Sequence, residues 1–560
     1  MGQRMKKTEA KSIAVILFLF VLIENIISVF LDYCADSGYA VAMAHRLLQG
    51  DGMFVKMWEP HQTSAFVIAG FMKLYESVLG TNEGIVIYLH VVGLALYAIT
   101  ATFLIVTLKK HVDKNLAYFM GALLMILRPK MVQLPDYANL TIIFSVCYFI
   151  FLIRFFLGNK KPINLIFASV FLCLNVLAYP SCIILFAGLI ACILLYSEKK
   201  VRDIAISAGV CALFGAIYSG FFILKYDLNY LIQRVSKIIG ADTHSDESIY
   251  TGFAYYEEFV LGIVVLALCF LFAGITMLAI KKLRKDKRAD FGLILSIYFT
   301  VFICAERVLV PIVFKNSNLG SWCVDKIILF AIIIIGAFGY KSLNSGQKKI
   351  YVAGMITSGC TFVATMLLTN LSFLTIFAYT HLAVMVSFMS MSCLKKEKSG
   401  EHYKERIPSY VALACLIILA FSQLLNCGGK AENYVRTGPL KGLVTTLNEC
   451  NKSRSTYESW NRLLDENDVV LIAQEYGLDP LYYTFSEAGI ASFSTISTIS
   501  LGEGLKEYWD EFPEKEPTVI AVPSWEGREE GYIPDWLSSK MQEEYELSNI
   551  EEFWNFYRKK

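Results

Sequence analysis

The stretch LDYCADSGYAVAMAHRLLQGDGMFVKMWEPHQTSA, residues 31–65, decides how the chain is organised. It follows the first apolar run directly and precedes a long series of others. For so apolar a chain it gathers many titratable side chains, namely Asp32, Asp36, His45, Arg46, Asp51, Lys56, Glu59 and His61. Ionisable groups next to membrane-embedded segments are costly and are often functional. The stretch is therefore either a loop that carries chemistry or a solvated connection between two helices.

The composition indicates a membrane protein. Hydrophobic residues make up 56% of the chain and the formal net charge is +2, whereas soluble domains are about 45–50% apolar. The excess lies in runs of roughly 17–25 residues, the length that crosses a bilayer as a helix. We therefore predict an α-helical polytopic membrane protein.

Thirteen membrane spans are predicted from these runs. They cover residues 12–30, 84–108, 114–128, 138–157, 162–179, 181–196, 203–224, 257–280, 291–314, 325–341, 350–369, 373–393 and 408–426. Loops rich in lysine and arginine alternate with loops poor in them, and basic loops favour the cytoplasmic side. We expect a multi-pass protein of the plasma membrane with a cytoplasmic N-terminus and an extracytoplasmic C-terminal part.

The first external loop, residues 31–83, is long enough for two short helices on the membrane surface. Residues 37–49 carry apolar side chains at helical spacing, and Gly50 follows as a C-cap. Residues 65–78 form a second such segment that ends at Gly80. We expect the functional site in this loop.

The composition changes after residue 426. Residues 1–426 form the predicted multi-span domain, and residues 427–560 a small extracytoplasmic α/β domain. DVVLIA (468–473) and PTVIAVP (517–523) are its predicted buried strands. Acidic side chains outnumber basic ones there, which fits a soluble external domain and gives no support to a nucleic-acid partner.

Asp36 is the leading candidate for a catalytic acid–base residue. It follows the first span by a few residues, near the level of the outer headgroups. A carboxylate there is partly desolvated, which raises its basicity, and it can take a proton from an acceptor hydroxyl. An aspartate before a helical run is also a good N-cap, and the two roles are compatible. Asp32 is the competing carboxylate.

Two further pairs of residues are candidates for substrate binding. Glu59 and His61 flank a proline and can face the same cavity as Asp36; the alternative is a polar turn. Glu306 and Arg307 stand inside the ninth apolar run, where ionisable residues usually face a cavity. Arg307 can bind a phosphate that enters from the lipid side; the alternative is an ion pair with another helix.

The short second external loop also carries charges close to the membrane. Arg128 lies at headgroup depth, which suits a lipid-linked phosphate. Asp136 can hold a divalent cation such as Mg or Mn, or orient a sugar. The alternative is that Arg128 and Lys130 only anchor the loop at the interface.

The layout resembles the GT-C superfamily of membrane glycosyltransferases, which includes protein O-mannosyltransferases, the aminoarabinose transferase of lipid A and the catalytic subunit of oligosaccharyltransferase. The resemblance covers the series of about thirteen spans, the large first external loop and the C-terminal external domain. The local match comprises Asp36-Ser37-Gly38-Tyr39, Ala44, Leu47, Leu48, Gly50, Pro60 and the segment from Lys73-Leu74 to Gly80.

The resemblance implies transfer of a sugar from a polyprenyl-phosphate donor to an extracytoplasmic glycan, lipid or protein. Asp36 would be the base of an inverting displacement, and Asp136 would correspond to the second-loop acidic residue. Tyr39 joins the substrate-binding candidates. Relatives often carry a second acidic residue after the first, and a lysine before the proline where this chain has Glu59. The resemblance therefore implies that His61, Arg128 or Arg307 contacts the phosphate.

Three other functions compete with this reading. A polysaccharide ligase or polymerase would carry its main external loop in the middle of the chain. A transporter would show paired half-sequences and broken helices near the midplane, and the sequence shows neither. A non-catalytic envelope-assembly scaffold would keep its function when Asp36 is replaced.

Overall fold

The computed structural model describes residues 2–31, 33, 35–59, 61–127, 133–158, 160–240, 256–283, 298, 332–334, 336–337, 339–368, 377–393, 432–473, 479–495, 501, 504–524 and 533–560. Four of the predicted positions, Asp32, Arg128, Glu306 and Arg307, lie outside the described residues. The backbone of Asp36 is described and its side chain is not.

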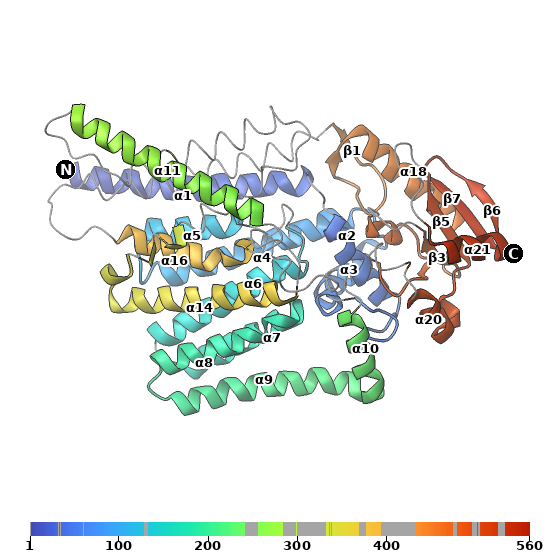
Figure 1. Cartoon of the computed structure of the whole chain (residues 1–560), viewed down its shortest axis with the longest axis horizontal. Coiled ribbons are helices and arrows are strands. Elements are labelled where there is room, and N and C mark those ends of the chain that lie inside the picture. The colour runs from blue at the N-terminus through green and yellow to red at the C-terminus, as the bar shows by residue number, and fades with distance from the viewer. Residues whose placement is uncertain are drawn as a thin grey trace.

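Most helices lie side by side in a bundle at the N-terminal end of the molecule (Figure 1). They are α1 Gly2–Leu31, α4 Ile85–Leu108, α5 Lys114–Ile126, α6 Tyr137–Leu157, α7 Pro162–Ala178, α8 Ile184–Tyr196, α9 Lys200–Ile223, α11 Tyr256–Leu283, α14 Ser345–Leu368 and α16 His381–Ser392. Among the described residues, α4, α6 and α9 are long and apolar enough to cross a membrane. They coincide with three predicted spans, and the total of thirteen stays a prediction.

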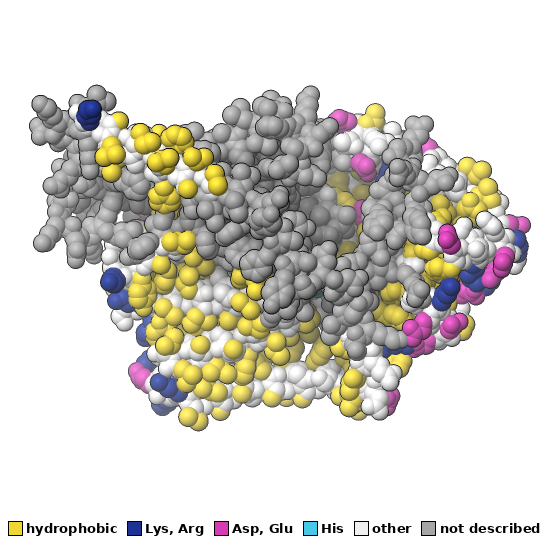
Figure 2. All heavy atoms as spheres, viewed as in Figure 1, with side chains coloured by type: hydrophobic (Ala, Val, Ile, Leu, Met, Phe, Trp, Pro, Cys, Tyr) yellow, Lys and Arg dark blue, Asp and Glu magenta, His cyan; other side chains and the backbone are white. Residues whose placement is uncertain are grey.

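The apolar helices differ in what covers them. Helix α6 packs against α4, α7 and α14, and nearly all its side chains are buried. Helix α9 is mostly exposed, and its apolar Leu213 and Ile217 lie on the surface. Figure 2 shows hydrophobic side chains over much of this end of the molecule, while charged side chains gather on the C-terminal region. A helix that is apolar and yet exposed is typical of contact with lipid.

The loop of residues 31–83, predicted to be the first external loop, forms both predicted helices, α2 Ala35–Leu48 and α3 Ala65–Leu79. Helix α3 ends as predicted at Gly80, whose φ of 67° is the left-handed conformation that glycine adopts without strain. Helix α2 does not lie on a surface, because the side chains from Ser37 to Arg46 are buried throughout. The expectation of a surface helix was wrong here: α2 packs on both α3 and the C-terminal region.

The C-terminal region contains a five-stranded sheet of order β4-β3-β5-β7-β6. The strands are β3 Val469–Ile472, β4 Gly489–Ile490, β5 Val519–Pro523, β6 Tyr545–Ile550 and β7 Trp554–Lys559, and a separate pair joins β1 Asn433–Tyr434 and β2 Val444–Thr445. Strand β3 is parallel to β4 and β5, whereas β7 is antiparallel to β5 and β6. Strands β3 and β5 lie where the sequence predicted them.

Helices cover both faces of this sheet. On one face, Trp460 of α18 Leu447–Leu463 packs edge-on against Trp554 of β7, with ring centroids 5.2 Å apart. On the other face, α20 Gly504–Glu511 and α21 Asp535–Glu544 pack on the alternate side chains of β3 and β5. Alternation along a strand places successive side chains on opposite faces, which explains the two cores.

The first external loop and the C-terminal region share one hydrophobic core. Side chains of α2 and α3 pack in the same buried cluster as Trp460, Val470 and Trp554. A further helix, α10 Leu228–Gly240, also reaches the C-terminal region, where Arg234 pairs with Glu511 of α20. The loop is therefore held between the bundle and the C-terminal region, as Figure 1 shows.

Candidate functional site

The N-terminal turn of α2 carries Asp36 and lies close to the C-terminal region. The Tyr33 hydroxyl donates a 2.7 Å hydrogen bond to Asp479, which precedes the short 3₁₀ helix η7 Pro480–Thr484. Gly38 fits between them, since a Cβ there would lie 2.0 Å from the Tyr33 hydroxyl and 2.3 Å from the Asp479 carboxylate. Burial raises the pKa of Asp479 to about 6, against hydrogen bonds from Leu481 and Tyr33 that lower it.

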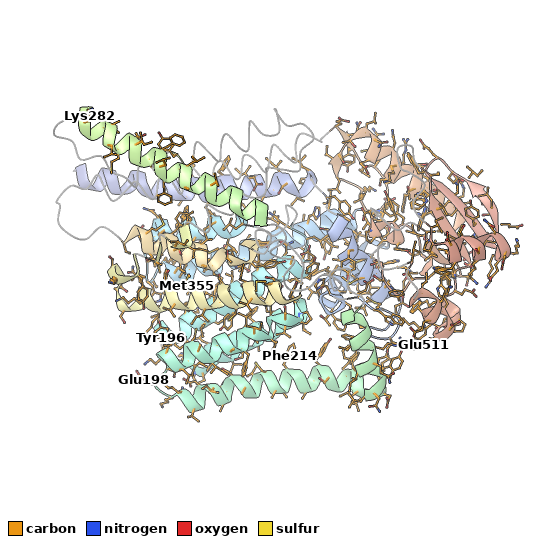
Figure 3. All side chains as sticks on the ribbon, viewed as in Figure 1. Tyr196, Glu198, Phe214, Lys282, Met355 and Glu511 are labelled. Atoms are coloured by element: carbon orange, nitrogen blue, oxygen red, sulfur yellow. The ribbon has the colours of Figure 1, made fainter. Side chains whose placement is uncertain are left out.

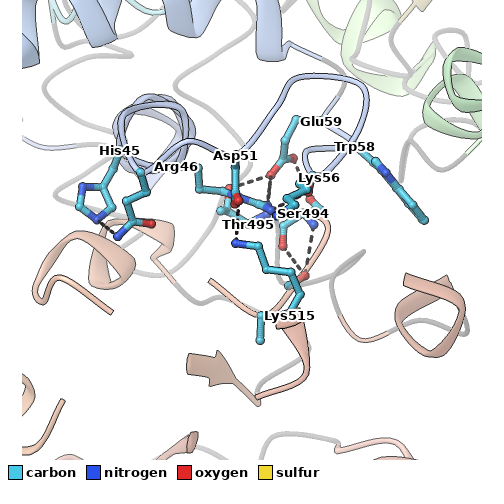
Figure 4. Close-up of polar contacts among 12 residues, drawn as sticks. His45, Arg46, Asp51, Lys56, Trp58, Glu59, Ser494, Thr495 and Lys515 are labelled. Atoms are coloured by element: carbon cyan, nitrogen blue, oxygen red, sulfur yellow. Dashed lines mark hydrogen bonds and ion pairs between the residues drawn. The ribbon is translucent and has the colours of Figure 1, made fainter. Parts of the chain in front are cut away.

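A buried ion network follows at the other end of α2 (Figure 4). The Arg46 guanidinium lies 2.9 Å from Asp51 and 4.0 Å from Glu59, and its Nη2 donates to the carbonyl of Lys56 at 2.7 Å. Lys515 of the C-terminal region adds a second cation, 2.6 Å from Asp51. Two cations thus face two carboxylates across the contact between the loop and the C-terminal region.

Glu59 is fixed by the C-terminal region. Its carboxylate accepts hydrogen bonds from the Ser494 hydroxyl at 2.8 Å and from the Thr495 amide at 2.5 Å. Burial raises the pKa of Glu59, although Arg46 and these hydrogen bonds oppose the shift. The pKa of Asp51 is lowered, because Arg46 and Lys515 outweigh the effect of its burial. The pKa values of these two carboxylates, which belong to one network, are therefore shifted in opposite directions.

Tyr39 connects this network with an aromatic cluster. Its side chain is buried, and burial together with the nearby Glu59 and Tyr137 holds the pKa of Tyr39 well above its ordinary value. The His61 ring stacks on Tyr137 with centroids 4.0 Å apart and on Tyr179 at 5.1 Å. The structure thus brings Tyr39, Glu59 and His61 together at the end of the bundle.

Asp136 lies at the same end, as the N-cap of α6. Its carboxylate accepts from the Asn139 backbone amide at 2.8 Å and from the Asn139 side chain at 3.1 Å. Tyr97 in turn donates to Asn139 at 2.8 Å. The next residue, Tyr137, is the one that stacks on His61. Asp136 therefore fixes the start of α6, and the first residue of this helix, Tyr137, belongs to the aromatic cluster.

The described residues do not gather a set of ligands for the predicted divalent cation. Among the described residues, no three His, Cys, Asp or Glu side chains are gathered so that they could hold a metal ion. Asp136, the predicted ligand, uses one carboxylate oxygen to cap α6. A cation site usually needs several carboxylate or carbonyl oxygens. The described residues offer no such set of ligands, and we derive no step through a cation.

Four residues of this site were not singled out from the sequence: Arg46, Asp51, Asp479 and Lys515. Arg46 and Asp51 stood in the loop as charged residues, but nothing local indicated that they would be buried as a pair. Asp479 and Lys515 lie more than four hundred residues after Arg46 and Asp51 in the sequence. Only the tertiary contact reveals their part in the site.

No protein-family model and no curated protein sequence matches the chain. Among solved structures, the archaeal oligosaccharyltransferase AglB from Archaeoglobus fulgidus, in complex with an inhibitory peptide and a dolichol-phosphate, is 12% identical with a TM-score of 0.46. The match covers 92% of this chain and 70% of that chain. ArnT from Cupriavidus metallidurans bound to undecaprenyl phosphate is 11% identical with a TM-score of 0.47, covering 97% of both chains.

The resemblance to GT-C glycosyltransferases rests on the residues of the sequence quoted above. The chain is similar in structure to AglB and ArnT. Because their TM-scores lie below 0.5 and identities near one residue in ten, these likenesses carry no argument about activity. The activity has to be argued from the residues of the site.

Proposed function

We propose that the chain is an integral membrane glycosyltransferase that moves a sugar from a polyprenyl-phosphate donor to an extracytoplasmic glycan, lipid or protein. One observation carries the proposal: the first external loop buries Tyr39 and Glu59, and stacks the partly buried His61 on Tyr137, beside the end of an apolar helix bundle. Such a concentration of titratable groups at one end of a lipid-facing bundle suits a lipid-linked polar substrate.

The proposed reaction is a single displacement with Asp36 as its base. The acceptor hydroxyl gives its proton to the Asp36 carboxylate while its oxygen bonds to the anomeric carbon. The bond between that carbon and the phosphate oxygen breaks, so polyprenyl phosphate leaves and the configuration inverts. Asp36 is the second residue of α2, where the positive end of the helix dipole favours its ionised form.

In this proposal the remaining site residues bind and position. His61, Arg128 and Arg307 are the candidates for meeting the charge that develops on the phosphate. Glu306 is proposed to line the path of the donor, and Asp136 to position the cluster around Tyr137. Arg46 is a positioning residue, because it holds the loop that carries Glu59. We place the first loop and residues 427–560 on the extracytoplasmic side.

The test is sugar transfer from a panel of radiolabelled polyprenyl-phosphate sugars, comparing the intact protein with Asp36→Asn. A matched control is Asp113→Asn, because Asp113 also lies at a helix start but at α5, away from the loop. We expect transfer from one donor that the control retains and that the Asp36 variant loses by a hundredfold or more, since a general base contributes roughly 10²–10⁴-fold.

Two other results would change the assignment. Undiminished transfer by a well-folded Asp36→Asn protein would exclude Asp36 as the catalytic base. Asp32 or Asp136 would then be the candidates for that role. No transfer from any donor would count against the enzyme and favour the transporter or scaffold.

A further inference from the structure

A second polar site lies at the opposite end of the bundle. A cavity of about 210 Å³ opens where α6 and α8 end and α9 begins, with Phe155, Phe156 and Tyr196 as its aromatic wall. The polar side of the lining consists of three cations, one hydroxyl and two carboxylates: Lys160, Lys199, Arg202, Ser197, Glu198 and Asp203. Figure 3 labels Tyr196 and Glu198 at this end, far from Glu511 at the C-terminal region.

Positive charge dominates around this cavity. Lys160 pairs with the exposed Glu198 at 2.5 Å, and Arg202 pairs with the buried Asp203 at 2.6 Å. Lys199 makes no ion pair within the part of the chain that the structure describes. A further cation, Lys349 of α14, lies 5.8 Å from the centre of the Tyr196 ring. Four cations thus surround two carboxylates, which leaves the mouth of the cavity positive.

The position of the cavity indicates which kind of anion it meets. Helices α6 and α9 are two of the three that are long and apolar enough to cross a membrane, so their adjoining ends mark a membrane boundary. Exposed apolar side chains, Leu194, Leu195 and Val201, stand beside the cavity. A ligand bound there can contact the lysines of the cavity with its charged part and the exposed side chains of Leu194, Leu195 and Val201 with its apolar part.

We propose that this cavity binds the phosphate headgroup of an anionic membrane lipid. Lysines at the ends of membrane helices attract anionic headgroups. The aromatic wall supports the glycerol part of the lipid, and the exposed leucines of α8 lie along its acyl chains. The site is separate from the proposed donor site, and it does not depend on the proposed transferase activity.

The experiment is native mass spectrometry of the full chain in detergent with added phosphatidylglycerol or phosphatidylcholine. The test variant is Lys160→Glu with Lys199→Glu, and the matched control is Lys109→Glu with Lys110→Glu. The control changes the net charge equally, at two exposed lysines that follow α4 and do not line the cavity. Lys199 is the N-cap of α9, where a glutamate suits the helix dipole, so the helix should form normally.

We expect the intact protein to retain phosphatidylglycerol over phosphatidylcholine, and the test variant to lose at least tenfold of that retention while the control keeps it. Equal retention of both lipids, or unchanged retention in the test variant, overturns the proposal. Glycerol 3-phosphate is the soluble competitor: displacement of the lipid at matched concentration would assign the site to free phosphates instead. Gel filtration and melting temperature confirm that each variant is folded.

Discussion

Two clusters of charged residues stand at opposite ends of the helix bundle, and they differ in exposure more than in composition. The side chains of Arg46 and Glu59 are 0% exposed at the contact between the first loop and the C-terminal region. The side chains of Lys160 and Glu198 are 47% and 77% exposed at the far end of the bundle. Arginine or lysine meets a carboxylate in both, yet water reaches only one of them.

The difference teaches what each cluster can do. A buried charge that loses its partner has no water to replace it, so the buried cluster fixes one arrangement of the loop. An exposed pair adds little to stability, because water and salt screen it. The exposed cluster can therefore exchange its partner for a ligand, whereas the buried cluster cannot.

Arg46→Met should show the largest effect. Methionine fills a similar volume but leaves Asp51 and Glu59 without their shared cation. We expect a loss of about 3–5 kcal/mol, the usual result of breaking a buried pair. The measurement is thermal unfolding in detergent, followed by tryptophan fluorescence.

The control for Arg46→Met is Lys56→Met. Lys56 pairs with Glu514 at 2.8 Å, and both side chains are partly exposed. Its loss should destabilise the protein by at most about 1 kcal/mol. If both variants unfold at the same temperature, burial does not separate the two kinds of ion pair and the comparison fails.

His45 gives the next largest effect, and it depends on pH. Burial lowers its pKa to about 4, although Asp51 opposes the shift, so the folded protein holds a neutral ring that accepts from Gln49. The unfolded chain binds the proton first. Stability is therefore complete above about pH 6.5 and falls as the pH drops towards 4, by up to about 3 kcal/mol for a shift of this size.

His45→Gln should remove that part of the pH dependence, since glutamine does not titrate. The measurement is the melting temperature of both proteins from pH 7 to pH 4, and the difference between them should grow on acidification. His111→Gln is the control at the opposite end, where the histidine is only half-buried. Parallel curves for wild type and His45→Gln would show that the ring does not stay neutral.

Asp136→Ala and Asp113→Ala compare two N-caps, one at each end of the bundle. Each carboxylate accepts from a backbone amide at 2.8 Å, Asn139 in α6 and Asn115 in α5. Both changes should cost roughly 0.5–2 kcal/mol. Only Asp136 adjoins the aromatic cluster, so only its variant should also reduce sugar transfer. Equal sugar transfer by the two variants would show that Asp136 only caps α6 and has no part in the reaction.

The parts of the fold that depend on local sequence were predictable. Apolar runs located α4 and α6, alternating short runs located β3 and β5, and Gly80 ended α3 where it was expected. Each of these follows from residues that are neighbours along the chain.

The burial of α2 was not predictable, because its partners are distant in sequence. Gly38 meets Asp479, and Glu59 meets Thr495. Amphipathic spacing in α2 suggested a surface helix, since one polar face normally meets water. Here the charged side chain of Arg46 contacts carboxylates and not water. No pattern within residues 31–65 predicts this replacement of water by carboxylates.

Glu198→Gln should have the smallest effect on stability and the clearest effect on binding. The Glu198 side chain is 77% exposed, so the melting temperature should stay unchanged while Lys160 loses its neutralising partner. Retention of phosphatidylglycerol should then rise, because the cavity gains net positive charge. Glu551→Gln is the matched control, as it breaks a similar 2.6 Å pair with Arg462 in the C-terminal region. A fall in melting temperature, or reduced lipid retention, would mean that the exposed cluster holds structure as the buried one does.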